Sequence, residues 1–142
     1  ICQKMDDNSI FIEKLRSSGL RPTKQRIEIC KFLFDRKKTF HFTISDLSKI
    51  FKKRTDEKIS LATIYNTVHS FKKKGYLKEI LVNSEKSYFD TNTSIHHHFL
   101  DVATNKLIDL QEDDVGDIKI KKNLPNKKIK SVEVLVKIEN IN

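Results

Sequence analysis

The sequence is poor in cysteine, proline, glycine and tryptophan, and these shortages exclude several classes of protein. It has 2 Cys, 2 Pro, 3 Gly and no Trp in 142 residues, and 37% of its residues are hydrophobic, so we expect a folded chain rather than a disordered one. Cys2 and Cys30 form no Cys-x-x-Cys pair, which excludes a four-cysteine structural zinc site and argues against a disulfide framework. The sequence therefore fits a reducing cytoplasm.

Long apolar runs and enzyme motifs are missing too. The longest apolar runs are far too short to span a bilayer and no secretory leader is visible, so we expect no membrane partner. The chain also has no Gly-x-Ser-x-Gly, no glycine-rich phosphate loop and no His-Glu-x-x-His. We therefore expect no enzymatic activity.

Positive charge is abundant, and it is unevenly distributed. The net charge is +9. Residues 1–82 hold 19 basic and 9 acidic residues, a balance of +10, whereas residues 83–142 hold 9 and 10, a balance of −1. This asymmetry favours a polyanionic partner for the first part of the chain, and the alternative is a feature that only serves solubility.

The stretch 60–74, SLATIYNTVHSFKKK, predicts an amphipathic helix with Ser60 as its N-cap. The residues of its expected buried seam are Leu61, Ile64, Val68 and Phe71. Its expected outer face holds Ala62, Asn66, His69, Ser70 and Lys73. An exposed asparagine among small neighbours can reach base edges in a major groove, and flanking lysines can hold phosphates. The alternative is an ordinary surface helix.

The other elements complete a recognisable order. Residues 9–18, 24–36 and 44–53 predict helices, and residues 77–82 and 86–89 predict a hairpin after the helix at 60–74. The last three of these helices, at 24–36, 44–53 and 60–74, followed by a hairpin, give the order of a winged helix-turn-helix. The remainder predicts strands at 96–102, 106–110 and 131–138, with a weak helix at 112–122. So small a sheet is marginal alone, which favours a two-fold homodimer.

A cluster of cations marks the start of the helix at 24–36. Arg21, Lys24 and Arg26 lie beside Thr23, which can cap the helix, and helix N–H groups favour phosphate. We interpret the cluster as a contact with the DNA backbone, and the alternative is a solvated helix end.

Histidines supply candidate metal ligands. On an extended chain His96 and His98 point to one face and His97 to the other. Asp90, Asp109 and, from the first part of the chain, His41 could complete a mixed nitrogen and oxygen site, which suits zinc, manganese or ferrous iron. The alternatives are surface histidines or a packed His97, and imidazoles also ligate haem iron.

Several motifs resemble those of a known family. They are GLRPTKQR, HFTISDL, ISLATIYNTVHSF followed by GYL, and KSYFDTNTSIHHHF. They resemble the ferric uptake regulator family of metal-responsive repressors, over residues 9–138. Within it the chain is most similar to the iron response regulator branch, because of the run YFDTN with HHHF, the asparagine at position 66 and the lack of cysteine pairs.

The resemblance implies an α+β fold in three parts. These are an N-terminal winged helix-turn-helix DNA-binding domain at 1–82, a hinge at 83–90 and a small C-terminal α/β dimerisation and ligand-sensing domain at 91–142. It also implies homodimers that bind AT-rich, inverted-repeat operators in double-stranded DNA, at promoters of iron and haem genes.

The resemblance also assigns residues to DNA. Tyr65 and Asn66 match base-facing positions, and Arg21 matches a basic residue that enters the minor groove. Many relatives carry Arg where this chain has Asn66, so its operator should differ from theirs. With the residues inferred above, the predicted DNA-binding set is Arg21, Lys24, Arg26, Thr63, Tyr65, Asn66 and Lys73.

The regulatory metal site implied by the resemblance holds one divalent ion, Fe, Mn or Zn. Its five ligands would be His41, Asp90, His96, His98 and Asp109. The structural cysteine zinc site of the family is missing, because Asp101 and Thr104 stand where its first cysteine pair would be. The fold must therefore hold without cysteine-bound zinc.

Haem is the second ligand that the resemblance implies. Members of the iron response regulator branch sense haem and act when iron is scarce. The run His96, His97 and His98 is the implied haem contact. The N-terminal Cys-Pro haem motif of some members is absent, because Cys2 is followed by Gln3.

Two other functions stay open. One is a manganese- or zinc-responsive repressor of the same fold that does not sense haem. The other is a basic, ligand-independent DNA-binding protein of the nucleoid type. A response of DNA binding to metal or to haem discriminates among the three.

Overall fold

The computed structural model describes residues 7–54 and 58–142, and it divides into two compact units. The first unit ends at Thr93 and the second begins at Ser94. Cys2 and residues 55–57, between two of the predicted helices, lie outside the described residues. The predicted division into functional domains at 82 and 90 stays a prediction.

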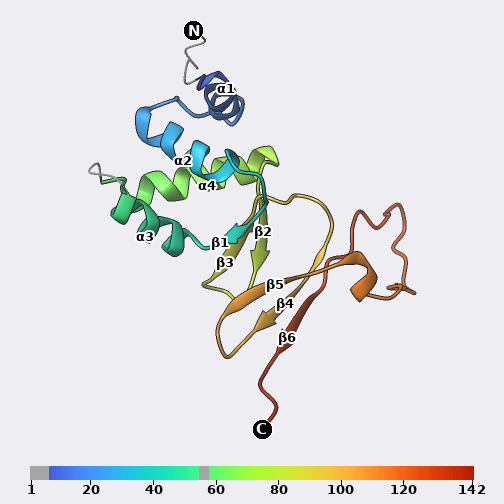
Figure 1. Cartoon of the computed structure of the whole chain (residues 1–142). Coiled ribbons are helices and arrows are strands. Elements are labelled where there is room, and N and C mark those ends of the chain that lie inside the picture. The colour runs from blue at the N-terminus through green and yellow to red at the C-terminus, as the bar shows by residue number, and fades with distance from the viewer. Residues whose placement is uncertain (1–6, 55–57) are drawn as a thin grey trace. The chain divides into compact units, whose positions relative to one another are not determined.

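Four helices build most of the described part of the first unit. They are α1 (Ser9–Ser17), α2 (Lys24–Phe34), α3 (Ile44–Arg54) and α4 (Leu61–Lys74) (Figure 1). Hydroxyl side chains cap three of them: Thr23 accepts from Arg26 N, Thr43 from Asp46 N and Ser60 from Thr63 N. The caps at Thr23 and Ser60 were predicted. Each cap satisfies a helix N–H that would otherwise lack a partner.

The C-terminal end of α4 is set by a glycine. Gly75 has φ +94°, a left-handed conformation that costs a side-chain-bearing residue energy, and its N–H bonds to the carbonyl oxygens of Phe71 and Lys72. The helix therefore ends where the chain must turn into the following strand.

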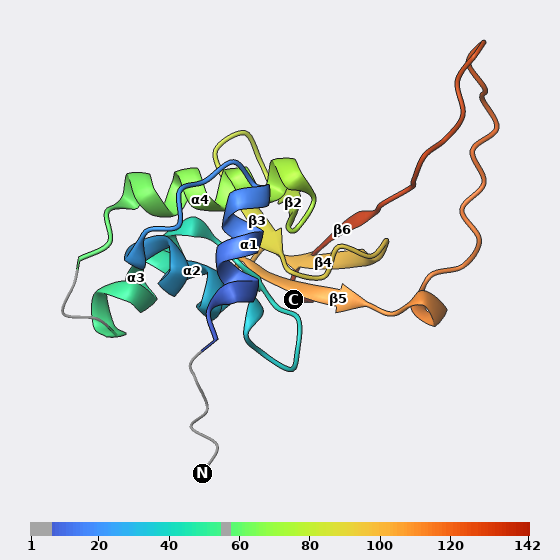
Figure 2. The same ribbon diagram turned by 90° about the horizontal axis from the view of Figure 1, so that it is seen from above.

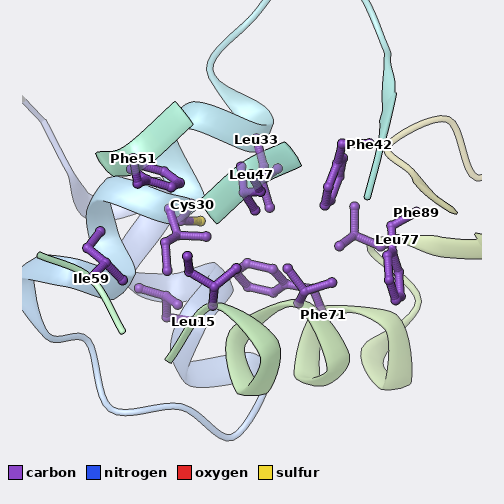
Figure 3. Close-up of a cluster of buried hydrophobic side chains, with 13 residues drawn as sticks. Leu15, Cys30, Leu33, Phe42, Leu47, Phe51, Ile59, Phe71, Leu77 and Phe89 are labelled. Carbon is purple, nitrogen blue, oxygen red and sulfur yellow. The ribbon is translucent and has the colours of Figure 1, made fainter. Parts of the chain in front are cut away.

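The core of the first unit lies between the helices and one face of its sheet. Figure 3 shows Phe71 of α4 pointing into the same interior as side chains from the other elements. Its buried members are Leu15, Ile29, Cys30, Leu33, Phe42, Leu47, Phe51, Ile59, Ile64, Val68, Phe71, Leu77 and Phe89. Burying one such Leu, Ile or Phe side chain stabilises the fold by about 1.5–3 kcal/mol.

A three-stranded antiparallel sheet completes the first unit. Its order is β1-β3-β2, from β1 (His41–Phe42), β2 (Lys78–Leu81) and β3 (Ser87–Asp90). The hairpin of β2 and β3 was predicted, whereas no strand was predicted where β1 lies. The register places Asp90 of the central strand between His41 and Lys78.

The second unit is built on another three-stranded sheet. Its order is β5-β4-β6, from β4 (His97–Asp101), β5 (Lys106–Leu110) and β6 (Leu135–Ile138). The outer strands β5 and β6 pair with β4 antiparallel and parallel, respectively. Between β5 and β6 the chain forms one 3-10 turn, η1 (Glu112–Asp114), and then a long extended segment (Figure 2).

Two predictions about the second unit are wrong in part. The weak helix expected at 112–122 is limited to η1, because Gly116 follows and Ile118 and Ile120 alternate with lysines, a pattern that favours extended chain. The strand expected at 131–138 begins only at Leu135, and Val136 within it is 37% exposed.

The seam of α4 differs from its prediction at one position. Ile64, Val68 and Phe71 are fully buried as expected, but Leu61 is 59% exposed. The first turn of α4 extends past the core, so the seam starts one turn later. Thr67 takes a place in the seam instead, and its buried hydroxyl donates to the Thr63 carbonyl oxygen at 2.7 Å.

This difference generates a stability test on one helix. We expect Ile64→Ala to lower the free energy of unfolding by about 2–5 kcal/mol, because it leaves a cavity in the core. The matched control, Leu61→Ala, should change it by less than about 0.5 kcal/mol. Urea unfolding followed by circular dichroism measures both, and equal losses would contradict the observed burial.

Candidate functional site

The outer face of α4 presents side chains that can contact DNA. Tyr65 is 51% exposed, Asn66 and Lys73 are exposed, and Thr63 is half-buried beside its cap. The Ser60 cap and the buried seam fix the rotation of the helix, so these side chains share the face away from the core. The structure thus places the four α4 residues predicted to bind DNA where they are accessible.

An aromatic stack supports Tyr65. Its ring lies 4.1 Å from the ring of His69, one helical turn on, and His69 meets Phe89 of β3 edge-on at 5.4 Å between centroids. The four-residue spacing in α4 predicts the first contact, but no sequence signal indicated Phe89. The stack restrains the Tyr65 ring against the sheet while half of the residue remains exposed.

The cations before and within α2 have different roles. Arg21 and Lys24 are exposed at the helix start. Arg26 is half-buried, and its Nη1 donates to the Arg21 carbonyl oxygen at 3.0 Å, so it also holds the loop that carries Arg21. Gln25 Nε2 donates to the Lys58 carbonyl oxygen at 3.5 Å, which links the start of α2 to the residues preceding α4.

Three candidate metal ligands converge within the second unit. His98 Nε2 lies 3.0 Å and His96 Nε2 lies 3.7 Å from Asp109 Oδ1, and the two rings are 4.4 Å apart. The β4–β5 register produces this, because it pairs His98 directly with Asp109. Ligand atoms about 2.1 Å from one ion lie about 3–3.5 Å apart, so the donor set fits a divalent cation.

A backbone contact fixes the orientation of the His96 imidazole. His96 Nδ1 lies 2.8 Å from the Ser94 carbonyl oxygen. With the proton on Nδ1, this contact leaves Nε2 to face Asp109 as an electron-pair donor, which is the usual arrangement for a metal-binding histidine.

His97 points to the opposite face, as the alternation predicts. Its Nδ1 accepts a hydrogen bond from the backbone N–H of Val134 at 3.0 Å, just before β6 begins. His97 therefore helps to hold the chain that leads into β6. The predicted haem trio of His96, His97 and His98 is split between two faces of the sheet.

The other two predicted ligands lie in the first unit. Asp90 is 1% exposed and pairs with His41 across the β1–β3 ladder. Asp90 Oδ1 also accepts from Asn92 N at 2.8 Å. Burial lowers the pKa of Lys78 on the other side of Asp90, and the carboxylate charge partly opposes that shift. The five predicted ligands are thus two neighbours on one sheet and three on another.

Comparisons with known proteins identify the family of this chain. The model of the ferric uptake regulator family matches residues 17–138. Peroxide-responsive repressors PerR of Staphylococcus aureus are 32% identical over 109 residues, which span 75% of this chain and 70% of theirs. The chain belongs to the ferric uptake regulator family. Members of the family are dimeric, DNA-binding transcription regulators that respond to metals, and not enzymes.

Solved structures confirm the fold. The ferric uptake regulator of Pseudomonas aeruginosa with manganese is 16% identical, with a TM-score of 0.66 over 94% of this chain and 99% of that one. The regulator of Vibrio cholerae is 18% identical, with a TM-score of 0.68 over 91% and 98%. A zinc-bound manganese uptake regulator reaches 0.58 at 19% identity, over 92% and 98%. The α+β fold class is therefore confirmed, whereas the iron response regulator branch stays a prediction.

The described part of this ferric uptake regulator family member contains one cysteine, and it lies in the core. Cys30 is fully buried in α2, and burial raises the pKa of its thiol to about 11. Asp101 is the last residue of β4. It stands at a position where the family resemblance implies a cysteine in relatives. In the described residues, every helix is too short or too polar to cross a bilayer.

The buried thiol gives a direct test of the core around α2. In a Cys2→Ser variant, which leaves Cys30 as the only thiol, we expect no reaction with a thiol reagent at pH 8 in the native state and full reaction in urea. Stability should fall as pH rises from about 9 to about 11, because the unfolded thiol ionises first. Fast reaction of the native protein would contradict the burial.

Proposed function

We propose that this chain is a dimeric, sequence-specific transcription regulator of iron and haem genes that acts in the cytoplasm. Its operator is an AT-rich inverted repeat in double-stranded DNA. Its DNA affinity is set by a divalent metal or by haem at the histidine site. The observation that supports this most strongly is the convergence of His96, His98 and Asp109 in a chain whose family responds to metals.

The distribution of ligands explains how metal could control DNA binding. A divalent cation supplies a positive charge with four to six coordination positions, more than the second unit fills with its three ligands. Asp90 and His41, neighbours on the first unit, would donate the rest. These ligands hold the two units in one arrangement when all five are engaged. The residues of α4 then face the operator with a defined orientation.

The exposed face of α4, which we call the reading face, and the cations near α2 would have separate roles on DNA: base recognition and phosphate binding. Asn66 can donate and accept at a base edge in the major groove, and Tyr65 is held beside it by the stack with His69. Arg21, Lys24 and Lys73 are exposed cations, which bind phosphates whatever the sequence. A two-fold dimer presents two such faces, which matches an inverted repeat.

Substitutions on α4 separate base reading from phosphate binding. We expect Asn66→Ala to weaken binding to the operator by about 5- to 150-fold, the range of one bidentate base contact, and to leave non-sequence-specific DNA nearly unaffected. The control, Lys73→Ala, should weaken both and reduce the salt dependence, because it removes a phosphate contact. Fluorescence anisotropy measures both. Equal losses for Asn66→Ala on the two DNAs would count against base reading.

A second candidate is a manganese- or zinc-responsive repressor that does not sense haem. The specific observation in its favour is the hydrogen bond from Val134 to His97, which leaves His96 and His98 with an oxygen donor rather than a run of three free imidazoles. A third candidate, the ligand-independent basic protein, predicts DNA affinity that is the same with and without either ligand.

Neighbouring histidines discriminate among these candidates. We expect His98→Ala to weaken Mn²⁺ and Zn²⁺ binding at least about 10-fold, because it removes a ligand, and the adjacent control His97→Gln to leave metal affinity unchanged. Calorimetric titration measures both variants. Titration with hemin should give a Soret shift that the double variant His96→Ala/His98→Ala loses. No Soret shift would favour the second candidate, and unchanged metal affinity in His98→Ala would refute the site.

A further inference from the structure

The aromatic stack on α4 connects the reading face to the strand that carries the candidate ligand Asp90. The rings of Tyr65 and His69 lie 4.1 Å apart between centroids, and those of His69 and Phe89 lie 5.4 Å apart. Phe89 directly precedes Asp90, the last residue of β3. All four residues belong to the first unit, so this path lies within one compact body.

The position of Phe89 follows the backbone of β3, because its ring is held in the core. It is 2% exposed, and it stacks on Phe42 of β1 at 6.0 Å between centroids and 28° between ring planes. Neighbouring residues of a strand point to opposite faces, so Phe89 and Asp90 lie on opposite sides of β3. Close packing leaves the ring little freedom of its own. A displacement of the end of β3 is therefore passed to the ring that His69 contacts.

A divalent ion would act at this end of β3. Asp90 is 1% exposed, and the register pairs it with His41 of β1. The next pair of the same ladder is Phe42 with Phe89. An ion bound by both Asp90 and His41 would hold β1 and β3 together at the pair that adjoins the stacked rings. Metal binding would thus restrain Phe89 without contacting it.

Tyr65 has room to leave the stack. A groove of about 840 Å³ lies between α3, α4 and the β2–β3 hairpin, and Tyr65, His69 and Phe89 are among the residues that line it. Tyr65 is 51% exposed. Rotation of its side chain can therefore carry the ring away from His69 into open space. The reading face accordingly has two states, with Tyr65 stacked on His69 or released from it.

The stack is weak enough to be adjusted. Two aromatic side chains in such a pair favour their contact by about 2- to 12-fold beyond the effect of the area that they bury. The released state of Tyr65 is then a populated minor state. Support of His69 by Phe89, from the side of the sheet, shifts the population toward the stacked state.

We propose that His69 is a positioning residue that transmits metal binding at the end of β3 to Tyr65. The bound ion holds β3 against β1, Phe89 then supports the imidazole of His69, and His69 keeps Tyr65 in place for reading the operator. Without the ion the stacked fraction falls. The proposal deepens the proposed function, on which it rests, by naming the residue that connects its metal site to its reading face. A histidine that only filled space would matter equally with and without metal.

Removal of the imidazole tests this coupling. We expect His69→Ala to reduce the Mn²⁺-dependent change in operator affinity by about 2- to 12-fold, the range of one aromatic pair. His69→Phe should retain most of the change, because a phenyl ring can make both ring contacts. The matched control Ser70→Ala, at the next position and also half-buried, should retain all of it. Fluorescence anisotropy of a labelled operator in chelator and in Mn²⁺ measures the four proteins.

Calorimetric titration separates the coupling from metal binding itself. Free His69→Ala should bind Mn²⁺ with wild-type affinity, because His69 contacts Tyr65 and Phe89 rather than a candidate ligand. Coupling between two sites is reciprocal, so operator DNA should raise the Mn²⁺ affinity of the variant less than that of the wild type, by the factor that anisotropy gives. Weaker Mn²⁺ binding by the free variant would assign His69 a structural role at the metal site and overturn the proposal.

Tyr65 itself can report its two states. The chain has 3 Tyr and no Trp, so labelling with 3-fluorotyrosine gives a simple ¹⁹F spectrum, in which Tyr65→Phe identifies the resonance of Tyr65. We expect Zn²⁺, which is diamagnetic, to shift this resonance in the wild type and in His69→Phe but not in His69→Ala. The same shift in His69→Ala would overturn the proposal.

The outcomes distinguish failure of this proposal from failure of the proposed function. Wild-type operator affinity that is the same with and without metal would refute the metal control on which the coupling rests. A wild-type response that His69→Ala keeps in full would overturn the role of His69 and leave metal control standing. Equal losses of operator affinity in chelator and in Mn²⁺ would also overturn it, because they indicate a residue that only shapes the helix.

Discussion

Strand pairing is the constraint on which the candidate metal chemistry depends. One ladder sets Asp109 opposite His98, and another sets His41 opposite Asp90. Ladder hydrogen bonds and the buried faces of both sheets fix these neighbours, since a slip of one residue would move every side chain to the other face. Each unit thus offers ligands whose spacing is set by backbone geometry before any ion arrives, which lowers the entropic cost of binding.

Backbone geometry and packing likewise fix the orientation of α4. Its buried seam fixes the rotation of the helix, so Tyr65, Asn66 and Lys73 face outwards, and the caps at Ser60 and Gly75 set its length. The stack of Tyr65, His69 and Phe89 then ties the reading face to β3, the strand that ends in Asp90. The exposed face of α4 and the ligand Asp90 are therefore both linked to β3. This is the physical basis on which metal could influence DNA recognition.

Sequence patterns predicted what local rules determine. The caps at Thr23 and Ser60, the β2–β3 hairpin and the opposite orientations of His97 and His98 all follow from short-range chemistry. Leu61 was wrongly predicted to be buried, because the spacing of apolar residues along a helix does not show where the core ends. A helix at 112–122 was wrongly predicted, because isoleucine and lysine occur in both helices and extended segments and Gly116 weakens the helical preference. Contacts such as His69 with Phe89 depend on tertiary packing, which one sequence does not reveal.

The central claim is that ligand binding at the histidine site controls operator affinity. Its most direct measurement is the anisotropy of a labelled AT-rich inverted repeat from an iron-gene promoter, titrated with wild-type protein in chelator, in Mn²⁺ and in hemin. We expect the midpoint to shift at least about 10-fold with one of the ligands, and the shift to vanish in His98→Ala. Identical midpoints in all three conditions would contradict it.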